Sequence, residues 1–218
     1  MSISVTRLVL VTVVVTLLSA RADAGICVDV ALHFAGPAPS HDLAATLEQE
    51  ATAIWAPYGV DLHWQSLACD VEDASFDVLI ESRPSHASTD HPVLGHTQVE
   101  LSRVDRVPIV IDSDATEKTL EALTLSELAT LVGRTHVGPE EMGRAFGRIL
   151  AHEIGHVLLG LPSHQHQGLM RPSFQAADMV RPTRWQYGLS PIEVARLGHR
   201  SGWIIARRHS AASSDVED

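Results

Sequence analysis

The sequence has no excess of basic residues: 16 lysines and arginines stand against 27 aspartates and glutamates, a net charge of -11. Nucleic acids and anionic membrane surfaces attract basic faces, so neither is expected as a partner. The chain also lacks internal repeats and any linker that would divide it. With 218 residues of ordinary globular composition, it is expected to form a single domain.

Long hydrophobic runs are scarce as well. The run Leu8–Leu18 has 11 residues, whereas a transmembrane helix needs about 20. Arg7 precedes this run, and small residues follow it as far as Ala24. The pattern predicts a secretory signal peptide over residues 1–24, with an uncleaved N-terminal anchor as the alternative. We therefore expect a secreted protein, extracellular or periplasmic, that has no membrane contact after cleavage.

Cysteine is limited to Cys27 and Cys69, and neither lies in a C-x-x-C pair that would suit a metal. An even number of cysteines in an oxidising compartment predicts one disulfide, Cys27–Cys69, which would close a loop of about 40 residues. Two unpaired buried thiols are the alternative.

Hydrophobic periodicity predicts that strands and helices alternate along residues 25–209. A capping box at Ser190 and Glu193 predicts a last short helix, and the small, acidic residues 210–218 are expected to form a disordered tail. The segment 83–95 is rich in Pro, Ser, His and Asp and is expected to be a loop. The expected strands are 26–34, 60–64, 76–81 and 107–111, and the expected helices are 42–55, 120–132, 139–159 and 191–197.

Histidine is abundant, with 13 residues, and two of them form the motif His152-Glu153-Ile154-Gly155-His156 inside the helix 139–159. A spacing of four places both imidazoles on one helical face, where both can bind a single zinc ion. Glu153 lies about 100° around the helix from His152, so its carboxylate can act as a general base without being a ligand. Such an ion lowers the pKa of a bound water towards about 7, which suits metal-assisted hydrolysis.

A catalytic zinc site needs a third protein ligand. Gly160 ends the helix and lets the chain reverse, which can bring a following histidine back towards the ion. His164 is the first candidate and His166 the second, with Glu193 as a more distant alternative.

The segment HEIGHVLLGLPSHQHQGLM resembles the active-site signature of the metzincin clan of zinc endopeptidases, which includes the matrix metalloproteinases. The resemblance implies that His152, His156 and His164 bind the metal and that Glu153 is the general base. It also implies that Gly160 is the turn glycine and Met170 the Met-turn methionine. Two more residues separate the second and third ligands here than in the pattern H-E-x-x-H-x-x-G-x-x-H.

The resemblance further implies an α+β, metzincin-like domain, with a twisted, mixed five-stranded sheet and about three helices. Val107–Ile111 would be the edge strand that binds an extended peptide, with an internal strand that has no substrate role as the alternative. The expected protein is a monomeric zinc endopeptidase with one catalytic Zn²⁺ and a polypeptide substrate. The alternatives are a secreted binding protein on the same scaffold and a gluzincin-like peptidase that uses Glu193.

Overall fold

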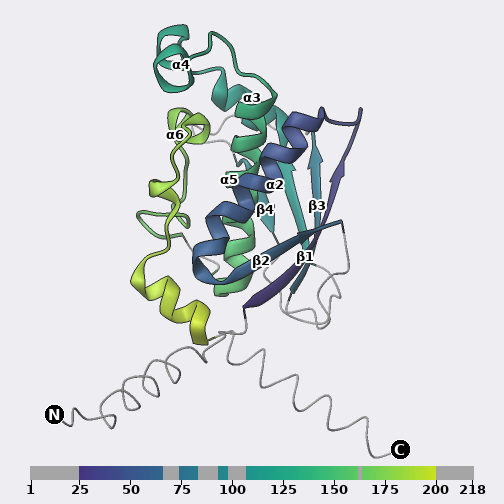
Figure 1. The fold of residues 1–218 in the computed structure, drawn as a ribbon, viewed down its shortest axis with the longest axis vertical. Helices are drawn as coiled ribbons and strands as arrows, with labels where there is room; N and C mark the ends of the chain where they lie inside the picture. Colours follow the sequence, from purple (N-terminus) through teal and green to yellow (C-terminus); the bar gives the residue numbers. More distant parts are fainter. Residues whose placement is uncertain (1–24, 66–73, 83–92, 98–106, 162–163, 200–218) are drawn as a thin grey trace, which may run out of the picture.

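Two long helices pack against each other on one face of a five-stranded sheet (Figure 1). The computed structural model describes residues 25–65, 74–82, 93–97, 107–161 and 164–199. The strand order is β2-β1-β3-β5-β4, in which only β4 is antiparallel to its neighbour. The expected α+β class with a mixed five-stranded sheet in one domain is therefore confirmed. The strands are β1 (Ile26–Phe34), β2 (Val60–Trp64), β3 (Ala74–Glu81), β4 (Gly95–Thr97) and β5 (Val107–Asp112).

Strand β1 lies between β2 and β3 and carries an apolar row into the core. Val28 lies opposite Leu62 of β2, and Val30 lies opposite Phe76 of β3. All four side chains are buried. Because side chains alternate between the two faces of a strand, this row lies on a single face of the sheet.

The helix that carries the HExxH motif, α5 (Pro139–Leu159), begins and ends where the sequence indicates. Pro139 occupies the first turn, and the Glu141 carboxylate accepts a hydrogen bond from the backbone N–H of Gly138 at 2.9 Å. Gly160 ends the helix at φ 59°, in the left-handed region that favours glycine.

The neighbouring helix α2 (His41–Trp55) approaches α5 closely at two glycines of α5. A Cβ at Gly147 would lie 2.7 Å from the carbonyl oxygen of Leu47, and a Cβ at Gly143 would collide with that of Leu43. Near the other end of the contact, the Trp55 indole donates a hydrogen bond to the carbonyl of Ala151 at 3.2 Å. The absence of side chains at the two glycines thus sets how closely α2 packs against the motif helix.

The structure has more helices than the three expected. The predicted helix 120–132 is replaced by two, α3 (Ser113–Leu120) and α4 (Leu125–Val132), because Asp112 and Thr124 each cap a new N-terminus. A short α6 (Ala176–Val180), the 3-10 turns η1 (Ala56–Tyr58) and η2 (Trp185–Tyr187) and a helix at 191–199 complete the described elements.

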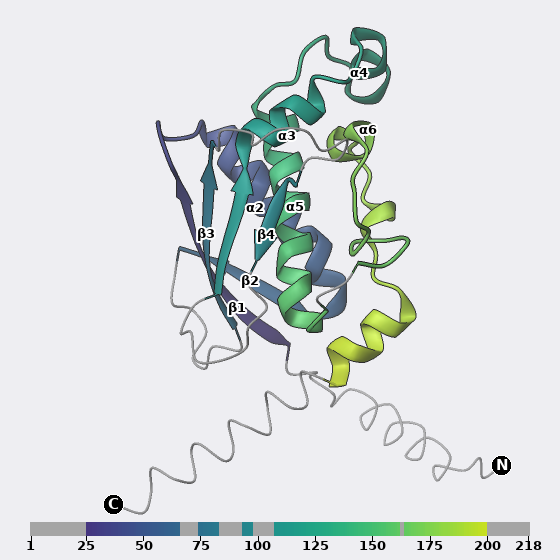
Figure 2. The ribbon, with the colours of Figure 1, turned by 180° about the vertical axis from the view of Figure 1, so that it is seen from behind.

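The expected edge strand is wrong. Strand β5 lies inside the sheet, and the edge beside α5 is β4, which includes the end of the segment predicted to be a loop (Figure 2). A strand of three residues is too short to show the alternation by which strands are recognised.

Several predictions fall outside the described residues. The signal peptide over 1–24, Cys69 as the partner of Cys27, and the tail 210–218 all remain predictions. Among the residues that are described, no helix is both long and apolar enough to span a membrane.

Candidate metal centre

Helix α5 brings the two histidines of the HExxH motif together in the interior. The Nε2 atoms of His152 and His156 are 3.1 Å apart, and both residues are buried. Their separation of four residues places them one turn apart on the same face of α5.

Backbone carbonyls fix the orientation of both rings. Nδ1 of His152 donates to the carbonyl of Leu169 at 2.7 Å, and Nδ1 of His156 donates to that of Leu161 at 2.6 Å. Since a carbonyl can only accept, each Nδ1 carries the proton, and each Nε2 of a neutral ring presents a lone pair. Burial also lowers the pKa of His152 to about 4, which keeps that ring neutral.

His164 completes a group of three histidines. After the reversal at Gly160, its ring centroid lies 5.2 Å from that of His152 and 5.0 Å from that of His156. One ligand nitrogen from each of the three residues lies within 4.8 Å of the others. Burial, and secondarily the neighbouring His156, lower the pKa of His164, which also favours its neutral form.

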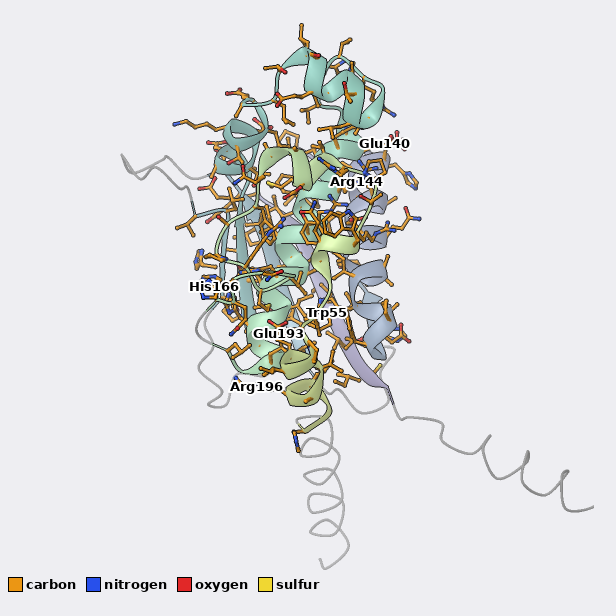
Figure 3. The ribbon with its side chains drawn as sticks, turned by 90° about the vertical axis from the view of Figure 1, so that its left-hand side faces the viewer. Trp55, Glu140, Arg144, His166, Glu193 and Arg196 are labelled. Atoms are coloured by element: carbon orange, nitrogen blue, oxygen red, sulfur yellow. The ribbon has the colours of Figure 1, made fainter. Side chains whose placement is uncertain are left out.

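The other two candidates for the third ligand lie elsewhere. His166, which Figure 3 labels, lines a cavity together with Trp185 and Gln186, and the lining of this cavity includes none of the three histidines. The Glu193 carboxylate accepts a hydrogen bond from the backbone N–H of Ser190 at 2.6 Å, as the predicted capping box requires. Within the described parts of the chain, the ligand group contains neither residue.

The three histidines fit a zinc ion. Two imidazole nitrogens bound to one zinc in tetrahedral geometry lie roughly 3.3 Å apart, close to the separation of the two Nε2 atoms. Two lone pairs that face each other in a buried site are unfavourable unless a cation lies between them. Nitrogen donors with outward Nδ1–H groups held by carbonyls are also the usual zinc set.

Glu153 follows His152 and lies on the side of α5 that faces edge strand β4. Its side chain is buried, and burial raises the pKa of its carboxyl to about 7. A Cβ built on Gly95 of β4 would lie 3.0 Å from Glu153 Oε1, so the strand passes directly beside the carboxylate.

Met170 packs against the motif helix α5. It is buried, and its sulfur packs so closely on Gly155 that a Cβ there would collide with it. The backbone around it is held by hydrogen bonds from Gln165 N–H to the Met170 carbonyl at 2.7 Å and from Leu169 N–H to the Gly188 carbonyl at 3.1 Å. These bonds also fix the Leu169 carbonyl that orients His152.

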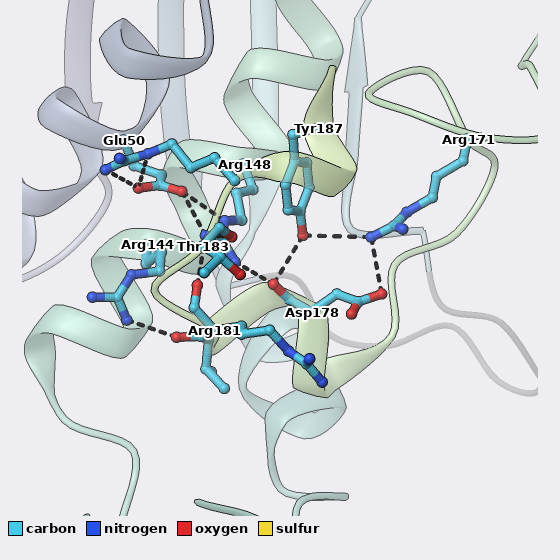
Figure 4. Close-up of polar contacts among 10 residues, drawn as sticks. Glu50, Arg144, Arg148, Arg171, Asp178, Arg181, Thr183 and Tyr187 are labelled. Atoms are coloured by element: carbon cyan, nitrogen blue, oxygen red, sulfur yellow. Dashed lines mark hydrogen bonds and ion pairs between the residues drawn. The ribbon is translucent and has the colours of Figure 1, made fainter. Parts of the chain in front are cut away.

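Two side chains that the sequence did not single out either contact His152 or lie one turn from it on α5. The ring of Phe174 meets that of His152 edge-on, with centroids 5.4 Å apart. Arg148 lies one turn before His152 and is fully buried, with its guanidinium 2.7 Å from Glu50 and bonded to the carbonyls of Asp178, Arg181 and Thr183 (Figure 4). An arginine in an amphipathic helix gives no sequence signal that it will be buried.

Comparisons with known proteins identify no family for this chain. No protein-family model matches the sequence, and no curated protein matches it. Among solved structures, archaemetzincin from Methanopyrus kandleri is similar, with 14% sequence identity and a TM-score of 0.48. The match covers 84% of this chain and 99% of that chain. At this level of similarity, the function has to be inferred from the residues of the site itself.

Proposed function

We propose that this protein is a secreted zinc-dependent endopeptidase that hydrolyses peptide bonds in polypeptides. The observation that carries the proposal is the convergence of His152, His156 and His164 beside Glu153. Secretion is supported by the signal-peptide pattern around Leu8–Leu18.

In this proposal each residue of the centre has a distinct task. A single zinc ion, when bound, would act as a Lewis acid and activate water for attack on the carbonyl of the scissile peptide bond. His152, His156 and His164 hold the ion, and the carbonyls of Leu161 and Leu169 keep the first two rings in the required tautomer. The Glu153 carboxylate would accept a proton from the attacking water and pass it to the nitrogen of the leaving amine.

Met170 supports the histidines from below in this proposal, as its packing on Gly155 suggests. The substrate is an extended polypeptide that pairs with the outer side of β4, the edge strand beside Glu153. We expect the enzyme to act as a monomer.

The first test measures zinc and peptide cleavage on the same purified protein. We expect one zinc per chain, cleavage of casein or of a random peptide library, loss of activity with a chelator and recovery with zinc. Glu153→Gln should keep the zinc and lose at least about 100-fold in rate, because the base is removed and the ligands remain.

Glu121→Gln is the matched control, since Glu121 is an exposed carboxylate at the end of α3. It should leave both zinc content and rate unchanged. Wild-type protein without zinc would contradict the proposal. Zinc-loaded protein that cleaves no member of the library would instead indicate a binding protein on this scaffold.

A further inference from the structure

Gly95 of β4 leaves room for two side chains of α5. A Cβ at this position would lie 2.8 Å from Cγ2 of Ile149 and 3.0 Å from Oε1 of Glu153. Real Cβ contacts are essentially never closer than 3.0 Å. Gly95 is not among the glycines with positive φ, so the backbone conformation alone does not require glycine here. What requires it is the close approach of the strand to the helix.

The surroundings leave little freedom to accommodate a methyl group. Ile149 is 1% exposed and lies in the core, so its side chain cannot shift without disturbing the packing around it. Strand β4 is held on its inner side by Asp112 N–H, which donates to the Leu94 carbonyl at 2.9 Å, and by the pairing of Gly95 with Ile111. A methyl group would therefore displace either the Glu153 carboxylate or the strand, and both change the spacing between them.

We propose that Gly95 is a positioning residue: the absence of its side chain sets the spacing between edge strand β4 and Glu153. The proposal rests on the endopeptidase function above. A peptide paired with β4 then has its scissile bond aligned with the Glu153 carboxylate. A change in this spacing misaligns bound substrate without touching the three histidines.

The test compares Gly95→Ala and Gly95→Val with two control variants. Gly138→Ala also presses a methyl group against a carboxylate, 3.1 Å from Glu141 Oε2, but at the start of α5, away from the histidines. Gly198→Ala places a Cβ where no heavy atom of the described residues lies within 4 Å. Zinc content, kcat and KM on one peptide, thermal stability and a crystal structure are measured for each variant.

We expect Gly95→Ala to bind one zinc per chain and to lose roughly tenfold in kcat, with KM changed less than about threefold. Gly95→Val should lose more, and both controls should match the wild type in kcat. The crystal structure, with or without zinc, should show the Glu153 carboxylate or β4 displaced by a few tenths of an ångström, as a contact of this kind demands.

Two results would overturn the proposal. One is a Gly95→Ala structure in which neither β4 nor Glu153 has moved, and the other is a loss of kcat no greater than that of Gly138→Ala. A wild-type protein that cleaves no peptide would refute the proposed function. The displacement seen in the crystal structures would still decide the positioning role of Gly95.

Discussion

The imidazole rings of His152 and His156 are oriented by carbonyls that follow α5 in the chain, at Leu161 and Leu169. The HExxH spacing alone predicts that two histidines share a helical face, because helix geometry fixes it. The identity of the third ligand depends on the path of the chain after Gly160, which no local pattern encodes. For that reason the sequence left His164, His166 and Glu193 open.

At the scale of residues, His164→Ala should weaken zinc binding by roughly 100-fold or more, because two histidines alone leave the ion incompletely held. His166→Ala is the matched control and should bind zinc as the wild type does, since the ligand group found among the described residues does not include His166. Titration of the metal-free proteins with zinc against a competing chelator measures both affinities. Equal affinity in His164→Ala and the wild type would refute the three-histidine site.

At the scale of elements, the predicted strand 26–34 matches β1, and the predicted helix 139–159 matches α5. Both are long and strongly periodic, so their local pattern is sufficient. Strand β4 was missed because it has three residues and is defined by its pairing with β5. Pro108 suggested an edge position for its strand, but one proline without an N–H does not prevent β5 from pairing on both sides.

The buried arginine of α5 connects three elements, because its guanidinium joins Glu50 of α2 to the segment that contains α6 (Figure 4). We expect Arg148→Met to lower the free energy of unfolding by about 3–5 kcal/mol, since it removes one partner of a buried ion pair. Arg184 also contacts Glu50 at 2.7 Å but is 40% exposed. Arg184→Met should therefore cost only about 1 kcal/mol.

Urea denaturation of Arg148→Met and Arg184→Met measures the difference between their free energies of unfolding. A double variant, Glu50→Gln with Arg148→Met, should be less destabilised than the sum of the two single changes, because each single change already removes the buried Arg148–Glu50 ion pair. Equal losses for Arg148→Met and Arg184→Met would contradict the structural role assigned to Arg148.

At the scale of the whole molecule, metal binding and folding should be coupled, because the three proposed ligands come from α5 and from the segment beyond Gly160. Zinc at 1,000 times its dissociation constant adds about 4 kcal/mol of stability. For a domain of this size, removal of zinc by a chelator should lower Tm by roughly 10 °C. Differential scanning calorimetry with and without chelator measures this shift.

The same experiment on His164→Ala provides the control. Its Tm should respond little to the chelator, since most of its zinc affinity is lost. A wild-type Tm that does not depend on zinc would show that the ion does not bind the folded protein.

Replacing helical glycines by alanine is a common route to more heat-stable enzymes, because alanine has the higher helix propensity and restricts the unfolded chain. The glycines of α5 are unsuitable for this substitution. Gly143 and Gly147 face the backbone of α2, and Gly155 faces the Met170 sulfur, so an added methyl group would collide at all three positions. A Cβ at Gly198, in the helix at 191–199, meets no atom within 4 Å in the part of the chain that the structure describes, so this is the glycine to replace first.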